Sequence, residues 1–161
     1  MAVAEIIGAA FGVLLLVIVA YVLVGGTLSM SETVATAQKD LTLQNEARIR
    51  TDIQINQSEI SIVGSGLRFS VKNSGNEIVS DFPHMDIYTY NAALGYQHYT
   101  YDPYNTGIAG NWTITSFEKD YVHPGMLDPG EKMWVVATFP GTAPQQVQVT
   151  TSNGVSASTV I

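Results

Sequence analysis

An uninterrupted apolar segment near the N-terminus limits what this chain can fold into more than any other feature. Residues 6–24 read IIGAAFGVLLLVIVAYVLV and contain no charge, amide or hydroxyl apart from Tyr21. As an α-helix rising about 1.5 Å per residue, the segment matches the roughly 30 Å hydrocarbon core of a bilayer. A helix satisfies its own backbone hydrogen bonds inside lipid. The sequence therefore predicts a membrane-spanning helix within residues 1–27.

A cleaved signal peptide is the alternative interpretation of this segment. Such a peptide carries a basic leader and an apolar core of only about 7–15 residues. Here the core is longer and the first basic residue is Lys39, so we expect an uncleaved anchor, and whether Met1 is the mature terminus stays open. Gly8 and Gly12 form a G-x-x-x-G step, which lets a second helix approach closely. Glycine is also common in membrane helices for other reasons, so both interpretations of this pair stay open.

Residues 28–48 are predicted to continue as a polar helical stalk. One narrow apolar seam recurs along it at steps of four, three and four, which is typical of a helix that packs on a partner or on its own domain. A solvated connector is the alternative. The dipeptide Gly25-Gly26 offers a hinge at the membrane surface. The seam consists of Met30, Val34, Ala37 and Leu41.

From Ile49 onward the apolar residues alternate with polar ones, the period of β-strands. Seven to nine short strands separated by turn residues fit into residues 49–161. Asn153-Gly154 between alternating runs is a strong hairpin signal. We therefore predict an all-β antiparallel Ig-like sandwich over residues 49–161, preceded by the long N-terminal transmembrane α-helix.

Composition and motifs exclude several kinds of chemistry. With 14 acidic and 7 basic side chains, the net charge of −7 argues against nucleic acid as a partner. The absence of cysteine removes disulfides, thiolate metal sites and thiol nucleophiles. The three histidines form no ligand motif, and the loop carboxylates lack compact calcium-binding spacing. We therefore expect no enzyme, no metal and no cofactor.

Two features point to binding and to location. Six tyrosines fall within 17 residues and are candidate partner contacts, because tyrosine offers a large contact area at low entropy cost. Ordinary strand packing explains the cluster equally well. Two N-x-S/T sequons, at Asn56 and Asn111, are candidate glycosylation sites, and glycosylation would place the β domain outside the cytoplasm. The six tyrosines are Tyr88, Tyr90, Tyr96, Tyr99, Tyr101 and Tyr104.

The layout resembles that of a known group of surface proteins. The opening MAVAEIIGAAFGVLLLVIVA, the segment 47–53 (ARIRTDI), and the turns 71–75 (VKNSG) and 127–131 (LDPGE) resemble the archaellum accessory proteins F and G, within the archaeal type IV pilin and archaellin superfamily. The resemblance implies a membrane-anchored sandwich outside the cytoplasmic membrane. It also implies the role of a stator that links the motor of the archaellum (the archaeal flagellum) to the surface layer.

Two functions of different classes follow. The first is this anchored stator or surface-attachment protein, with a surface-layer protein or archaellum subunits as partners. The second is a filament subunit, an archaellin or pilin, whose helices self-associate in the filament core while the sandwiches form the coat. In pilin-like chains a glutamate at the fifth position is expected to pair with the amino terminus of a neighbour, a role that Glu5 matches if Met1 is the mature terminus. Otherwise Glu5 is a residue at the level of the lipid headgroups.

Overall fold

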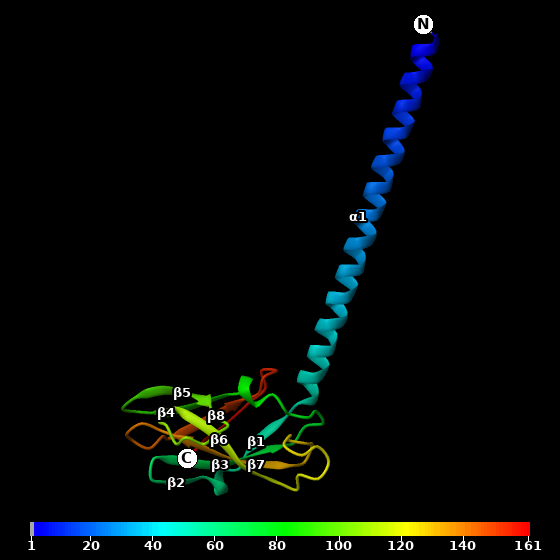
Figure 1. The fold of residues 1–161 in the computed structure, drawn as a ribbon. Coiled ribbons are helices and arrows are strands. Elements are labelled where there is room, and N and C mark those ends of the chain that lie inside the picture. The colour runs from blue at the N-terminus through cyan, green and yellow to red at the C-terminus, as the bar shows by residue number, and fades with distance from the viewer. Residues whose placement is uncertain (1) are drawn as a thin grey trace. The chain divides into compact units, whose positions relative to one another are not determined.

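The computed structural model describes residues 2–161, which form one helix followed by a β domain (Figure 1). The helix α1 spans Ala2–Arg50, a length of 49 residues. Contacts divide the chain into two compact units, and the second unit comprises Asn45–Ile161. The last turn of α1 therefore belongs to the β unit. Met1, on which the choice of mature terminus depends, lies outside the described residues.

The helix α1 is continuous from its apolar part into its polar part. Gly25 and Gly26 lie inside it without a break, so the predicted anchor and stalk are one element with no hinge between them. No proline interrupts the backbone hydrogen bonds, and the segment from Val3 is long and apolar enough to cross a membrane. Met30, Val34 and the rest of the apolar seam are exposed, and nothing within residues 2–161 covers them.

The prediction that strand alternation begins at Ile49 is wrong, because the helix continues to Arg50. The Thr51 amide still donates to the Ala47 carbonyl at 3.0 Å, and the Thr51 hydroxyl donates to the same oxygen at 2.8 Å. Arg48 and Arg50 occupy the last turn, where positive charge interacts favourably with the helix dipole. These local hydrogen bonds and charges outweigh a period-two pattern that is only a few residues long.

Nine strands and two short 3₁₀ helices make up the rest of the described chain, within the predicted number of strands. In chain order they are β1 Ile53–Ile55, η1 Gln57–Glu59, β2 Ser61–Val63, β3 Gly66–Asn73, η2 Phe82–His84, β4 Asp86–Asn91, β5 Gly95–Tyr101, β6 Asn111–Glu118, β7 Lys132–Thr138, β8 Gln146–Thr150 and β9 Ser156–Val160.

The strands form two facing halves of a sandwich that is close to a barrel. One half has the order β1-β3-β7-β6, with β2 also paired to β3, and the other has the order β5-β4-β8-β9. All pairings are antiparallel except that of β5 with β6, which is parallel and covers only Thr100 and Tyr101 on β5. At the opposite end β1 lies beside β9. The predicted antiparallel sandwich behind a long apolar helix is confirmed, and the parallel junction is the one departure from it.

The core fills the space between the two halves. Inward residues alternate with outward ones along the strands, as the period-two pattern predicted. The expected hairpin joins β8 to β9, with Gly154 at a φ of 82°. Strand β5 was not anticipated as a strand. The largest fully buried side chains include Trp112, Tyr99, Phe69, Leu67, Ile87, Leu127, Met133 and Val135.

Candidate interaction surfaces

Three of the predicted contact tyrosines lie together on the outer face of β4 and β5. Tyr90 is paired across the strands with Tyr96, and Tyr88 with His98. In both pairs the ring centroids lie 5.0 Å apart and the ring planes are tilted relative to each other. Such cross-strand aromatic pairs hold large rings in fixed positions on a sheet surface.

Glutamines from β8 extend this surface. Gln146 lies opposite Tyr90 and Gln148 opposite Tyr88 in the antiparallel register. The tyrosines and glutamines line a shallow depression of about 90 Å³. We call Tyr88, Tyr90, Tyr96, His98, Gln146 and Gln148 the Tyr–Gln face. Its amphipathic rings and uncharged amides suit contact with another protein better than contact with a charged ligand.

The other three tyrosines do not share this face. Tyr99 is only 1% exposed and hydrogen-bonds through its hydroxyl to Thr89 at 3.0 Å, so it belongs to the core. Burial raises the pKa of the Tyr99 hydroxyl above its ordinary value. Tyr101 is half-buried and packs on Trp112 with ring centroids 4.7 Å apart. Tyr99 therefore cannot serve as a partner contact, and Tyr101 contributes mainly to packing.

Tyr104 is 86% exposed on the loop that follows β5. Asp102 shapes this loop, because its carboxylate accepts hydrogen bonds from the Tyr104 amide at 3.0 Å and from the Thr106 amide at 2.7 Å. Hydrogen bonds from Thr106 hold the pKa of the Asp102 carboxyl below its ordinary value. The loop thus presents Tyr104 from a defined turn, apart from the Tyr–Gln face.

The end of α1 is fixed to the β domain by backbone hydrogen bonds. The Asn76 amide donates to the Arg50 carbonyl at 2.7 Å, and the Ser74 and Gly75 amides donate to the Asp52 carbonyl at 2.9 and 3.0 Å. We call residues 50–52 and 74–76 the helix joint. The bond to Arg50 satisfies a carbonyl that the end of a helix otherwise leaves to solvent, and the two bonds to Asp52 hold the residues that follow the helix.

Gly75 is required by space in the helix joint. A Cβ atom at this position would lie 2.4 Å from both the Arg50 carbonyl oxygen and the Asp52 amide nitrogen. Two further contacts hold the joint: Asn153 donates to the Thr51 hydroxyl at 2.6 Å, and the Arg50 guanidinium lies 3.7 Å from a Glu77 carboxylate oxygen. In the sequence, residues 71–75 are recognisable only as a turn, and nothing marks this turn as the contact for the helix end.

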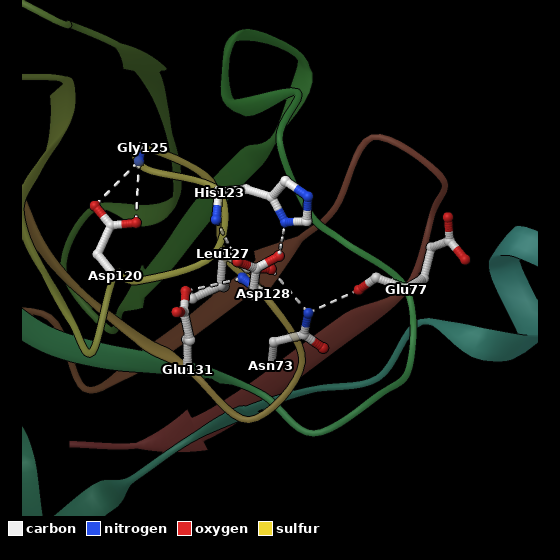
Figure 2. A network of polar contacts seen from close by, with 8 residues as sticks. All are labelled: Asn73, Glu77, Asp120, His123, Gly125, Leu127, Asp128 and Glu131. Carbon is white, nitrogen blue, oxygen red and sulfur yellow. Dashed lines mark hydrogen bonds and ion pairs between the residues drawn. The ribbon is translucent and has the colours of Figure 1, made fainter.

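The histidines and loop carboxylates make structural contacts. His123 donates its amide to Asp128 at 3.0 Å and pairs its ring Nδ1 with the same carboxylate at 2.8 Å (Figure 2). The Asp128 amide in turn donates to Glu131, and the Asn73 side chain donates to the carbonyl of Leu127. No group of three or more His, Cys, Asp or Glu residues within the described part of the chain is arranged to hold a metal. The network instead satisfies buried polar groups where the chain enters β7.

The two sequons differ in accessibility. Asn56 is exposed, and its side chain accepts hydrogen bonds from the amide and hydroxyl of Ser58 at the start of η1. Asn111 is half-buried at the first position of β6, and Thr113 of the same sequon is 5% exposed. Asn56 therefore remains the better candidate for a glycan.

On α1, Glu5, Gly8 and Gly12 are exposed. Nothing in the described chain lies within 4 Å of a Cβ built on either glycine. The described residues therefore leave the G-x-x-x-G step uncovered, and its contact with a second helix stays a prediction.

Comparisons with known proteins agree with this architecture. A curated relative from Archaeoglobus fulgidus, described as an uncharacterized protein, is 25% identical over 135 residues, which is 84% of this chain and 80% of the relative. The solved archaellum periplasmic stator protein FlaG from Sulfolobus acidocaldarius matches with a TM-score of 0.52 and 21% identity, over 69% of this chain and 99% of that one. A chain from the complex of FlaF and FlaG of the same organism matches with a TM-score of 0.50 and 22% identity, over 68% of this chain and 87% of that one.

These two structural matches confirm the predicted resemblance to the accessory proteins F and G at the level of the fold. The family model described as archaeal-type flagellin matches residues 7–161, which include both the apolar helix and the whole sandwich. This chain belongs to the archaeal-type flagellin family.

Proposed function

We propose that this chain is a non-enzymatic archaellum protein that acts as a membrane-anchored stator. In this role the apolar part of α1 holds the protein in the cytoplasmic membrane, and the sandwich lies outside it. The observation that carries the proposal is the likeness to the periplasmic stator protein FlaG, whose chain is covered almost end to end. The exposed Tyr–Gln face supplies the surface that a stator needs for its partner.

The partner in this proposal is a surface-layer protein or another archaellum subunit. The similar chain in the FlaF–FlaG complex supports a pairing with an accessory protein of the F type. The helix joint supports a mechanical role, since a stator must transmit force between its anchor and its sandwich. The joint does so through three backbone hydrogen bonds.

A filament subunit is the second candidate, and one observation favours it. The archaeal-type flagellin match begins at residue 7 and so includes the helix that would form a filament core. In a filament, copies of α1 would surround one another. Glu5 would then need a cation from a neighbouring copy, because an unpaired carboxylate in an apolar bundle is costly.

Two variants separate the candidates in cells that make the protein. The stator proposal predicts that the double variant Tyr90→Ala and Tyr96→Ala assembles normal filaments that do not rotate, because the partner surface is lost. The exposed Tyr121, which lies on the loop 119–131 outside the Tyr–Gln face, supplies the matched control Tyr121→Ala. Electron micrographs and swimming assays are the readouts.

The second variant, Glu5→Ala, tests the filament candidate. Glu5→Ala would break a buried pair at about 3–5 kcal/mol per contact, so filaments would disappear. In a stator the same change leaves the filaments intact. Purified filaments composed chiefly of this chain would refute the stator proposal.

A further inference from the structure

Three of the four lysines in this acidic chain lie around one cleft on the outer face of β1, β3, β7 and β6. The cleft has a volume of about 500 Å³. Its charged lining consists of these three lysines and a single glutamate, although the whole chain has a net charge of −7. The charged residues are Lys72, Lys119, Lys132 and Glu118.

The strand register sets two of these lysines directly opposite each other. Lys72 on β3 is paired with Lys132 on β7, and Lys132 is paired with Glu118 on β6. Like charges in directly opposed positions of a sheet destabilise it. Lys132 is compensated, because its Nζ lies 2.7 Å from Glu59 Oε1 and 3.8 Å from Glu118 Oε2. The hydrogen bond to Glu59 raises the pKa of the Lys132 ammonium.

Lys72 has no equivalent compensation within residues 2–161, where the ion pairs of the cleft are those of Lys132. Lys119, just after β6, is held at a φ of 64°, in the left-handed region that favours glycine over a lysine side chain. Two features that weaken the fold locally therefore lie at the cleft: the opposition of Lys72 to Lys132 and the positive φ of Lys119. Each of them places an ammonium group there. Such costs are expected where a site is kept for a ligand.

We propose that this cleft binds the carboxylate side chains of an acidic polypeptide segment of a partner protein. The cleft is larger than one small anion needs. The amides of Gln54 and Gln57, which also line the cleft, offer both donors and acceptors to a peptide backbone. The net charge of −7 disfavours a long polyanion such as nucleic acid. The cleft uses different strands from the Tyr–Gln face, so the inference does not depend on the stator proposal.

The test uses the full chain in an uncharged detergent, with fluorescently labelled hexaglutamate as the probe and hexaglutamine as the uncharged control. Anisotropy titrations at low salt should show saturable binding of hexaglutamate alone. Lys72→Gln should weaken binding about tenfold, because it removes a charge-assisted hydrogen bond. Lys39→Gln on α1 makes the same change in net charge at a lysine that does not line the cleft, and it should leave the affinity unchanged. Glu118→Gln should tighten binding, because it removes the one carboxylate that lines the cleft.

Thermal stability distinguishes a binding site from a structural one. Without peptide, Lys72→Gln and Lys119→Gly should each keep or raise the melting temperature while they weaken binding, because each relieves a local cost. The proposal is overturned if hexaglutamate does not bind, or if Lys72→Gln and Lys39→Gln weaken binding equally. Displacement of the peptide by inorganic phosphate at equal concentration would also overturn it, because the cleft would then be a site for small anions.

Discussion

Replacing Gly75 with alanine tests how tightly the end of α1 is built into the sandwich. The added Cβ would lie 2.4 Å from the Arg50 carbonyl oxygen and from the Asp52 amide nitrogen, and 2.9 Å from the Thr51 carbonyl carbon. All three atoms belong to the backbone, so a rotamer change cannot relieve the overlap. The turn 74–76 must instead move away from the helix end.

The size of the effect follows from the hydrogen bonds of the helix joint. Separating the two segments of the joint, residues 50–52 and 74–76, breaks the three bonds at 2.7, 2.9 and 3.0 Å, each worth about 1 kcal/mol. Any overlap that remains adds about 1–3 kcal/mol of strain. We therefore expect Gly75→Ala to lower the free energy of unfolding by about 4–6 kcal/mol. For a domain of this size that corresponds to a fall in melting temperature of about 16–24 °C.

Thermal unfolding of the full chain in detergent, followed by the near-ultraviolet signal of its aromatic residues, measures this fall. Asn76→Ala is the matched control, because it changes an exposed side chain of the same turn and keeps the bond from the Asn76 amide to Arg50. The control should stay within about 0.5 kcal/mol of the wild type. If Gly75→Ala melts together with Asn76→Ala, the reasoning about the joint is refuted.

Three further measurements test the buried hydroxyl of Tyr99, the lowered pKa values of two carboxyl groups and the membrane insertion of α1. Tyr99→Phe should cost about 1–3 kcal/mol in urea unfolding, because it strands the buried hydroxyl of its partner, whereas Tyr96→Phe on the outer face should be neutral. Asp102 and Glu59 have pKa values below their ordinary 3.8 and 4.5. Their stabilisation is therefore complete above about pH 5 and declines as the pH falls further, and Asp102→Asn should make that acid decline shallower. Leu15→Arg should weaken membrane insertion by about 2.5–3.5 kcal/mol, which fractionation would reveal as loss of the protein from membranes.

The elements that could be predicted are those set by local pattern. The apolar segment 6–24 predicts the helix, because an unbroken apolar composition is enough to indicate a membrane span. The alternation along β3, β4 and β7 predicts strands, because one face of each strand is buried. The hairpin at Asn153-Gly154 follows from its turn chemistry. The exact helix end was missed, because the hydrogen bonds of Thr51 to Ala47 and the arginines of the last turn outweigh a period-two pattern of only a few residues.

The candidate surfaces depended on register, which the sequence does not show. Alternation separates Tyr88 and Tyr90 from their inward neighbours on β4, but only the pairing of β5 with β4 shows that Tyr96 joins them while Tyr99 enters the core. Tyrosines that are close together in the sequence therefore divide between the outer face of the sheet and the core. Likewise Lys72 and Lys132 are 60 residues apart in the chain and become opposed only through the register of β3 with β7.

The helix joint depends little on the identity of most of its side chains. Its three hydrogen bonds use backbone atoms of residues 50–52 and 74–76, and a backbone atom is present whatever the side chain. Most positions of the joint can therefore change without loss of the connection. Gly75 is the exception, since its lack of a Cβ is what allows the two segments to meet. The attachment of the helix thus depends on space at one residue more than on the chemistry of the others.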